Sequence, residues 1–77
     1  MTEPRRFQCR LPDGQIRRRT RRRDQPVPTF AVVASAPGGK WGLYRMTASE
    51  DEVIRCVKEL FRRGQSAYIA EPELCRG

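Results

Sequence analysis

Arginine is the residue type that offers chemistry in this chain, and it is concentrated in one stretch. Six of the seven residues from 17 to 23 are arginine, with Thr20 between two triplets. Residues 1–23 contain nine arginines and two acidic residues, whereas residues 24–77 contain seven basic and seven acidic residues. The formal net charge of +7 is therefore local to the first third of the chain. Because guanidinium groups make paired hydrogen bonds to phosphate or carboxylate, this stretch predicts an anionic partner.

The residues that usually perform catalysis are missing or have a structural explanation. The chain has no histidine, so it lacks an imidazole base and the usual partner of a serine or cysteine nucleophile. Acidic residues 50–52 fall in the first turn of an expected helix, where they complement the helix dipole. Gly38-Gly39-Lys40 lacks the earlier glycine and the following Ser or Thr of a phosphate-binding loop. We expect no enzymatic activity, no metal site and no cofactor.

The three cysteines are Cys9, Cys56 and Cys75, which are widely spaced and form no C-x-x-C pair. A structural zinc site would need four ligands at closer spacing. We expect free thiols, with Cys9 and Cys56 in the core. A single disulfide that involves Cys75 is the alternative.

The basic stretch follows a strand pattern. Residues 6–11 alternate between polar and apolar, and Asp13-Gly14 before residues 15–23 indicates a β-hairpin. A two-residue Asp13-Gly14 turn would pair Cys9 with Arg18, whereas a three-residue turn would place Arg17 beside Cys9. We favour the first register, because unpaired arginines buried against the apolar face would be costly. It predicts one basic face, with Arg18 and Arg22 turned toward the core side. The predicted anion contacts are Arg6, Arg10, Arg17, Arg19, Arg21 and Arg23.

The rest of the chain supplies the elements that position this hairpin. Ser49 with Glu52 is a capping box, and Thr47 with Glu50 is a competing one. Gly64 ends the helix, and apolar residues at helical spacing predict the face that packs on a sheet. That stripe contains Val53, Ile54, Val57, Leu60 and Phe61. The expected segments are a basic β-hairpin or arm at 5–23, a proline linker at 24–28, a β-hairpin at 29–46, a helix at 49–63, a strand at 66–70 and a tail at 71–77.

These segments predict an α+β fold in one domain, residues 1–77, with the order β-β-β-β-α-β. One amphipathic helix packs on a mostly antiparallel sheet of four or five strands. Residues 29–34 are apolar on both faces, which is typical of a central strand covered on both sides, or covered on one side and paired by symmetry on the other. The strand after the helix is expected to lie parallel to its neighbour through a right-handed crossover.

Composition limits the class of protein. A chain of 77 residues is short for more than one domain, and no run approaches the roughly 20 apolar residues of a membrane span. The first six residues are not followed by the apolar run of a secretory signal. We expect a cytoplasmic protein without membrane contact.

We expect a small, non-catalytic basic protein that contacts the nucleic-acid backbone, of DNA or RNA, through the hairpin. Trp41 and Tyr44 are candidates for stacking on bases. Replacing Arg17, Arg19 and Arg21 together by Ser should abolish anion binding with little loss of fold. The alternative is a protein–protein interaction module that docks on an acidic surface of a larger protein.

Other roles stay open. A chain of this size and composition is generically similar to small accessory or inhibitor proteins of bacteria, phages or plasmids. A homodimer is possible, since Phe30, Val32 and Trp41 offer more apolar surface than one helix covers. The arginines can also form a solvated face without a partner.

Overall fold

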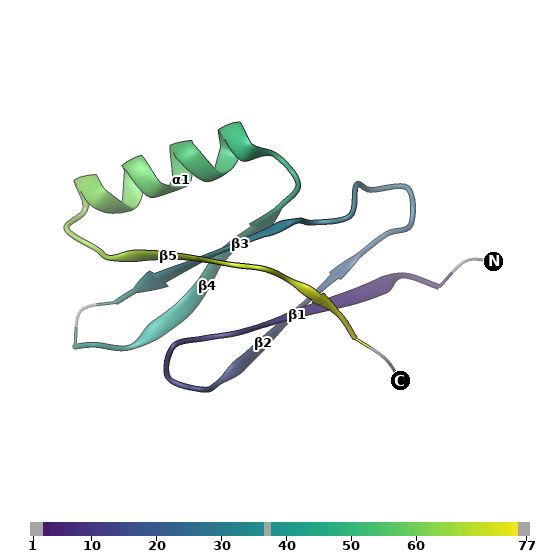
Figure 1. Ribbon diagram of the computed structural model, residues 1–77, viewed down its shortest axis with the longest axis horizontal. Helices are drawn as coiled ribbons and strands as arrows, with labels where there is room; N and C mark the ends of the chain where they lie inside the picture. Colours follow the sequence, from purple (N-terminus) through teal and green to yellow (C-terminus); the bar gives the residue numbers. More distant parts are fainter. Residues whose placement is uncertain (1–2, 37, 76–77) are drawn as a thin grey trace.

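The computed structural model describes residues 3–36 and 38–75 and has three layers (Figure 1). Two three-stranded sheets pack face to face, and the single helix covers the far side of one of them. In chain order the elements are β1 (Arg5–Arg10), β2 (Ile16–Arg21), β3 (Phe30–Ser35), β4 (Trp41–Thr47), α1 (Glu50–Arg62), β5 (Ala67–Ala70) and β6 (Glu73–Leu74). The α+β fold class predicted from the sequence is confirmed.

The central strand β3 is covered on both faces, as its two-sided apolar pattern predicts. Ala31 and Val33 point toward the hairpin layer, where they pack with Phe7 and other apolar side chains of β1. Val32 and Ala34 point the other way, into a second cluster with α1. Because successive side chains of a strand alternate between faces, one strand contributes to both clusters.

The two sheets differ from the single sheet of four or five strands that we expected. The sheet orders are β2-β1-β6 and β4-β3-β5. The alternation of Phe7, Cys9 and Leu11 gives β1 an apolar face, and this face buries itself against β3 instead of extending the sheet edge. The hairpin thus covers the side of β3 that α1 leaves open.

This arrangement also covers the apolar side chains that suggested a possible homodimer. Val32 is completely buried in the helix-side cluster, and Phe30 is half-buried against it. Trp41 is half-buried and packs on the hairpin-side cluster. The apolar surface of these three residues is therefore largely covered within the described part of the chain.

The chain after the helix departs from expectation in two places. β5 lies antiparallel to its neighbour β3 and not parallel to it. Since β4 is also antiparallel to β3, the helix connects two parallel strands that lie on opposite sides of β3. The expected tail contains β6, which pairs antiparallel with β1, and the Cys75 N–H donates to the Arg6 carbonyl over 2.9 Å.

The helix forms where the capping signals predict it. The Ser49 side chain accepts a hydrogen bond from the Glu52 N–H at 3.2 Å, and Gly64 has a φ of 73° just after the helix ends. The second half of the expected capping box is replaced, because the Ser49 N–H donates to Thr47 Oγ1 at 3.0 Å. The Glu52 carboxylate instead accepts a hydrogen bond from Arg45 at 2.8 Å.

Candidate nucleic-acid interface

The turn of the basic hairpin sets the position of every arginine that follows it. The Gly14 N–H donates to the Leu11 carbonyl at 2.9 Å, and the Leu11 N–H donates to the Gln15 carbonyl at 2.7 Å. Pro12 and Asp13 are thus the central residues of a tight turn, and Gly14 follows with a φ of 91°. This is the three-residue loop with a glycine bulge.

The register that we favoured is therefore wrong. Cys9 pairs with Arg17, Phe7 with Arg19, and Arg5 with Arg21. A two-residue Asp-Gly turn needs a positive φ at Asp13, whereas the only positive φ values in the described residues belong to glycines. Pro12 favours the observed turn, because its fixed φ suits the first central position. This proline is the signal in the sequence that identifies the register.

The expected cost of burying arginine does not arise for Arg17 and Arg19, because β2 is an edge strand and neither side chain is fully buried. Phe7 is covered by the second sheet and not by its partner on β2, and Arg19 stays exposed. Arg5 lies over the Phe7 ring, with 5.9 Å between its guanidinium carbon and the ring centroid. The arginines beside the apolar face thus lie at its margin.

Two arginines of the hairpin donate side-chain hydrogen bonds to backbone carbonyls outside the hairpin. Arg21 Nη2 donates to the Met46 carbonyl at 2.7 Å and links β2 to β4 across the two sheets. Arg5 Nη2 donates to the Gln25 carbonyl at 3.3 Å and fixes the loop that follows β2. Arg21, which we predicted as an anion contact, is therefore occupied within the protein.

Arg17 and Arg19 lie on the same side of β2 as Arg21 but make only local contacts. Arg17 Nη2 donates to Gln15 Oε1 at 2.5 Å, and Arg19 Nη1 donates to the neighbouring Arg18 carbonyl at 2.9 Å. Burial raises the pKa of the Cys9 thiol, and the charges of Arg19 and Arg17 lower it by a smaller amount. The two guanidinium groups thus act electrostatically on Cys9, which lies in the core next to them.

The outer face of the hairpin carries a different set of arginines. Arg6 and Arg10 project from β1, and Arg18 projects from β2 opposite Gln8. In antiparallel strands a diagonal neighbour is about 7–8 Å away, so Arg18 lies within that range of both β1 arginines. All three are exposed, and none makes a side-chain hydrogen bond or an ion pair within residues 3–36 and 38–75. Arg18, which we placed toward the core, belongs to this face.

A groove of about 1030 Å³ runs over part of the outer face. Arg6, Arg18 and Arg23 contribute basic side chains to it, and Arg23 Nε donates to the Glu3 carbonyl at 2.9 Å. Arg23, predicted as an anion contact, thus lines the groove. Glu73 lines it from β6, next to Gln8.

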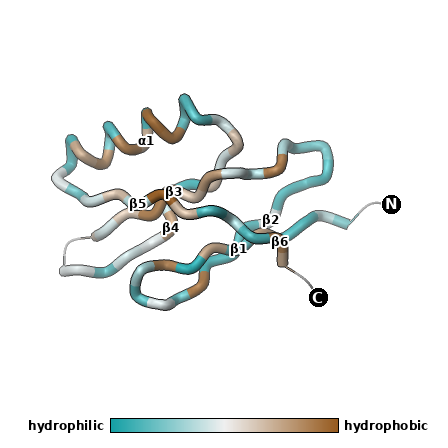
Figure 2. The backbone as a smooth tube through the Cα atoms, viewed as in Figure 1, coloured by the Kyte–Doolittle hydropathy of each residue, from teal (hydrophilic) through white to brown (hydrophobic). Residues whose placement is uncertain are grey.

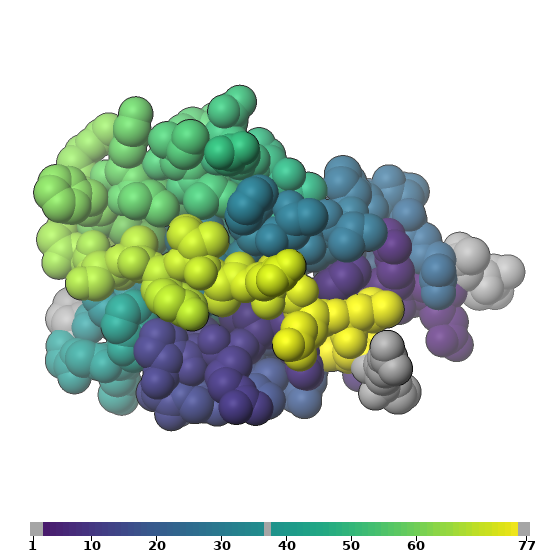
Figure 3. All heavy atoms as spheres, in the orientation of Figure 1, coloured from purple at the N-terminus to yellow at the C-terminus, as the bar shows by residue number. Residues whose placement is uncertain are grey.

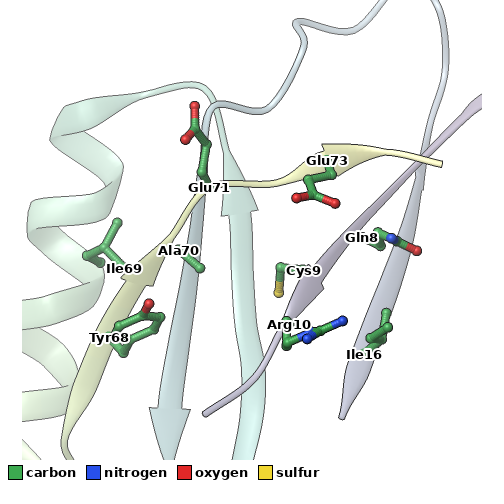
Figure 4. A pocket seen from close by; sticks show the side chains of 9 residues that line it. All are labelled: Gln8, Cys9, Arg10, Ile16, Tyr68, Ile69, Ala70, Glu71 and Glu73. Carbon is green, nitrogen blue, oxygen red and sulfur yellow. The ribbon is translucent and has the colours of Figure 1, made fainter. Parts of the chain in front are cut away.

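A second hollow, of about 550 Å³, lies between the two sheets where the chain crosses from β5 to β6 (Figure 4). Arg10 lies on one side, and Glu71, Glu73 and Tyr68 line the other parts. Two carboxylates with one guanidinium make this hollow a poor site for a polyanion. The basic surface therefore lies on β1 and β2 outside this cleft, with Arg10 at the boundary between the two.

The two candidate stacking residues lie away from the outer face. Trp41 packs in the core beneath the hairpin. The pairing of β3 with β4 shifts by one residue beside Tyr44, and Tyr44 lines a hollow with Arg55 and Glu59 of the helix. The structure brings neither ring to Arg6, Arg10 or Arg18, so we do not retain the stacking role.

We name five arginines the basic ridge: Arg6, Arg10, Arg17, Arg18 and Arg19. The first two come from β1 and the last three from β2, and residues along β2 point alternately to its two sides. In Figure 2 the backbone trace of β2 and of the loop after it is coloured mostly as hydrophilic. Of the nine arginines in residues 5–23, Arg22 alone lies within 4.0 Å of a carboxylate in the described part of the chain, at 3.3 Å from Asp24.

Other features of the described chain are limited. Its three cysteines are free thiols, with Cys9 and Cys56 buried, as we expected. Within residues 3–36 and 38–75, no group of three or more His, Cys, Asp or Glu side chains is arranged to hold a metal ion, and no helix is long and apolar enough to cross a membrane. Comparisons with protein-family models, with curated proteins and with solved structures found no match to this chain.

Proposed function

We propose that this protein binds the backbone of nucleic acid through the basic ridge, without a catalytic role. The observation that carries the proposal is the lack of internal partners for this charge. Five guanidinium groups lie on two adjacent strands, and none of them has a carboxylate within 4.0 Å among the described residues. Like charges on neighbouring strands repel, and phosphate groups would remove that repulsion.

The arrangement suits a chain of phosphates better than one small anion. The ridge follows strands of six residues each, and β2 offers arginines on both sides of an edge. Strands rise about 3.3 Å per residue, so the arginines are spread over a length that several successive phosphates occupy. Because Trp41 and Tyr44 lie away from the outer face, we propose contact with the backbone and not readout of bases.

The test compares two variants that remove the same charge. R6Q/R10Q/R18Q neutralises the outer part of the ridge, and K40Q/R55Q/K58Q neutralises three exposed basic residues elsewhere. Fluorescence anisotropy of labelled single- and double-stranded DNA and RNA gives the affinity of each. We expect the first variant to lose at least about tenfold more affinity than the second, with unchanged circular dichroism. Equal losses of affinity in the two variants would show that only net charge matters, and would overturn the proposal that the basic ridge is the binding surface.

A second candidate is an acidic protein surface, and one observation favours it. Ile16 lies on the outer face with an exposed fraction of 36%, and Leu74, exposed to 54%, lines the adjoining groove. Protein interfaces combine such apolar contacts with arginine. Binding to nucleic acid should strengthen with oligonucleotide length, whereas binding to one protein should saturate at a fixed stoichiometry.

A further inference from the structure

The helix exposes part of the apolar stripe that we expected to pack on the sheet. Val53, Cys56 and Leu60 are buried, but Ile54 is exposed to 46% and Phe61 to 83%. Positions 54, 57 and 61 repeat at helical spacing, so they form a second apolar row beside the buried one. A phenylalanine this exposed lies in water unless another surface covers it.

This row lies on the flank of α1 that adjoins β5. Val57, Phe61 and Ala67 line a common hollow of about 630 Å³, whereas the opposite flank adjoins β4. Ile69 of β5 pairs with Val32, so its side chain faces the helix layer, and it is exposed to 41%. The exposed row of the helix thus continues onto the edge strand.

The backbone of β5 is also open on this side. β5 pairs with β3 alone, and no described segment pairs with its other edge. The Ser35 N–H donates to the Ser66 carbonyl at 2.9 Å, which fixes the alternation of the ladder. Ala67 and Ile69 therefore direct their N–H and C=O groups outward. Figure 3 shows β5 crossing the front of the molecule with no other described strand over it.

We propose that a second copy of this chain covers this surface by antiparallel pairing of the two β5 edges. A two-fold axis normal to the sheet would join two three-stranded sheets into one of six strands. The same axis would bring the two α1 flanks together in opposite directions, with Ile54 and Phe61 packed against their counterparts. An edge strand that is left open invites such pairing.

The charges at the two ends of α1 indicate that the partner on this surface is a second copy of the chain. The first turn of α1 contains Glu50, at helical spacing from Ile54 of the exposed row, and the last turn contains Arg62, which is exposed and lies 3.9 Å from Glu59. In antiparallel helices the acidic end of one lies beside the basic end of the other, so the surface is complementary to itself. A partner with a uniformly acidic or basic helix would meet a like charge at one end.

The dimer would also extend the basic surface. A two-fold axis normal to the sheet leaves both hairpin layers on the same side of the six-stranded sheet and both helices on the other side. Two basic ridges would then face the same direction. This consequence rests on the proposed function, whereas the dimer itself does not, and its test contains no nucleic acid.

Sedimentation equilibrium of the full chain tests the proposal. We expect a dimer whose dissociation constant rises about 30-fold or more in Phe61→Glu, which places a charge at the centre of the contact. Val27→Glu, at a side chain exposed to 47% in the loop before β3, is the control and should leave the dimer unchanged. A monomer at all concentrations, or a dimer that Phe61→Glu leaves intact, would overturn the proposal.

A charge exchange tests the antiparallel arrangement of the helices. Glu50→Lys and Arg62→Glu should each weaken the dimer several-fold, and the double variant should restore it. The two residues are twelve positions apart, about 18 Å along the helix, so they cannot restore each other within one chain. A double variant weaker than both single variants would contradict the antiparallel pairing.

Discussion

Neighbouring arginines on one strand have different roles in this protein, because of what each guanidinium group contacts. Arg19 and Arg21 lie on the same side of β2, two residues apart. Arg21 reaches a carbonyl of the other sheet, whereas Arg19 bonds only the adjacent residue. Arg21 therefore belongs to the packing of the hairpin, and Arg19 is available to a ligand.

Replacing Arg21 should lower stability. Arg21→Ala removes a charged donor from the Met46 carbonyl, and hydrogen bonds of this kind contribute about 1.5–3 kcal/mol. We expect a loss of about 1–2 kcal/mol in urea unfolding, and almost no loss in Arg19→Ala. Equal stabilities of the two variants would contradict this assignment, and with it the structural role of Arg21.

The thiols should differ in reactivity. Cys75 is half-buried, whereas Cys9 is buried and burial raises the pKa of its thiol. A raised pKa leaves less thiolate, which is the reactive form, at a given pH. With limiting iodoacetamide at pH 8, peptide mass spectrometry should find Cys75 alkylated well before Cys9. If both were modified at the same rate, Cys9 would not be in the core of the native protein.

At the scale of elements, one turn decides which arginines share a face. Gly14 has a φ of 91° and has no atom within 4 Å of the position that a Cβ would take. A side chain there fits the space but strains the backbone. We expect Gly14→Ala to cost about 1 kcal/mol in thermal or urea unfolding.

Gly42 is the matched control for this turn. It lies in β4, also has open space around the added Cβ, and does not have a positive φ. Gly42→Ala should therefore be neutral or slightly stabilising. A neutral Gly14→Ala would show that the loop does not need its left-handed glycine, which would reopen the question of the hairpin register.

The contact between β4 and the start of α1 should add a small dependence on pH. The hydrogen bond and charge of Arg45 hold the pKa of Glu52 below its ordinary value of 4.5. A lowered pKa contributes stability above the ordinary value, and this contribution is lost as pH falls through the folded value. Both side chains are partly exposed, so we expect only about 0.3–0.5 kcal/mol.

Glu52→Gln measures that contribution. Its free energy of unfolding should lie slightly below that of the unaltered protein at pH 7, and the difference should vanish as pH falls through the lowered pKa of Glu52. A difference that persisted at pH 3 would mean that the Glu52 side chain contributes by packing and not by charge.

The elements could be predicted from the sequence more completely than their arrangement. Ser49 and Gly64 mark the ends of the helix, and the two-sided apolar pattern of residues 29–34 predicts β3, because local capping and burial decide both. The layer that covers β3 depends on packing between distant segments, which no local pattern contains. The prediction of the site was wrong in the register of the hairpin. The backbone angles at Pro12 and Asp13 set this register and so decide whether Arg18 or Arg19 faces outward.

For the whole molecule, charge and core occupy separate parts of the chain. The excess charge of +7 lies in residues 1–23, while the helix carries both signs. The apolar face of β1 is needed to cover β3, so the basic strand β2 is carried at the margin of the folded structure. The fold thus holds the ridge in place without neutralising it.

The salt dependence of binding tests the central claim most directly. Each phosphate contact on double-stranded DNA contributes about −0.9 to the slope of log affinity against log salt, so five contacts predict about −4.5. We would measure this slope for the unaltered protein and for R6Q/R10Q/R18Q between 50 and 200 mM salt. The account predicts a slope shallower by about 2.7 in the variant, with little change in K40Q/R55Q/K58Q. A slope near zero in the unaltered protein, or the same slope in all three proteins, would contradict it.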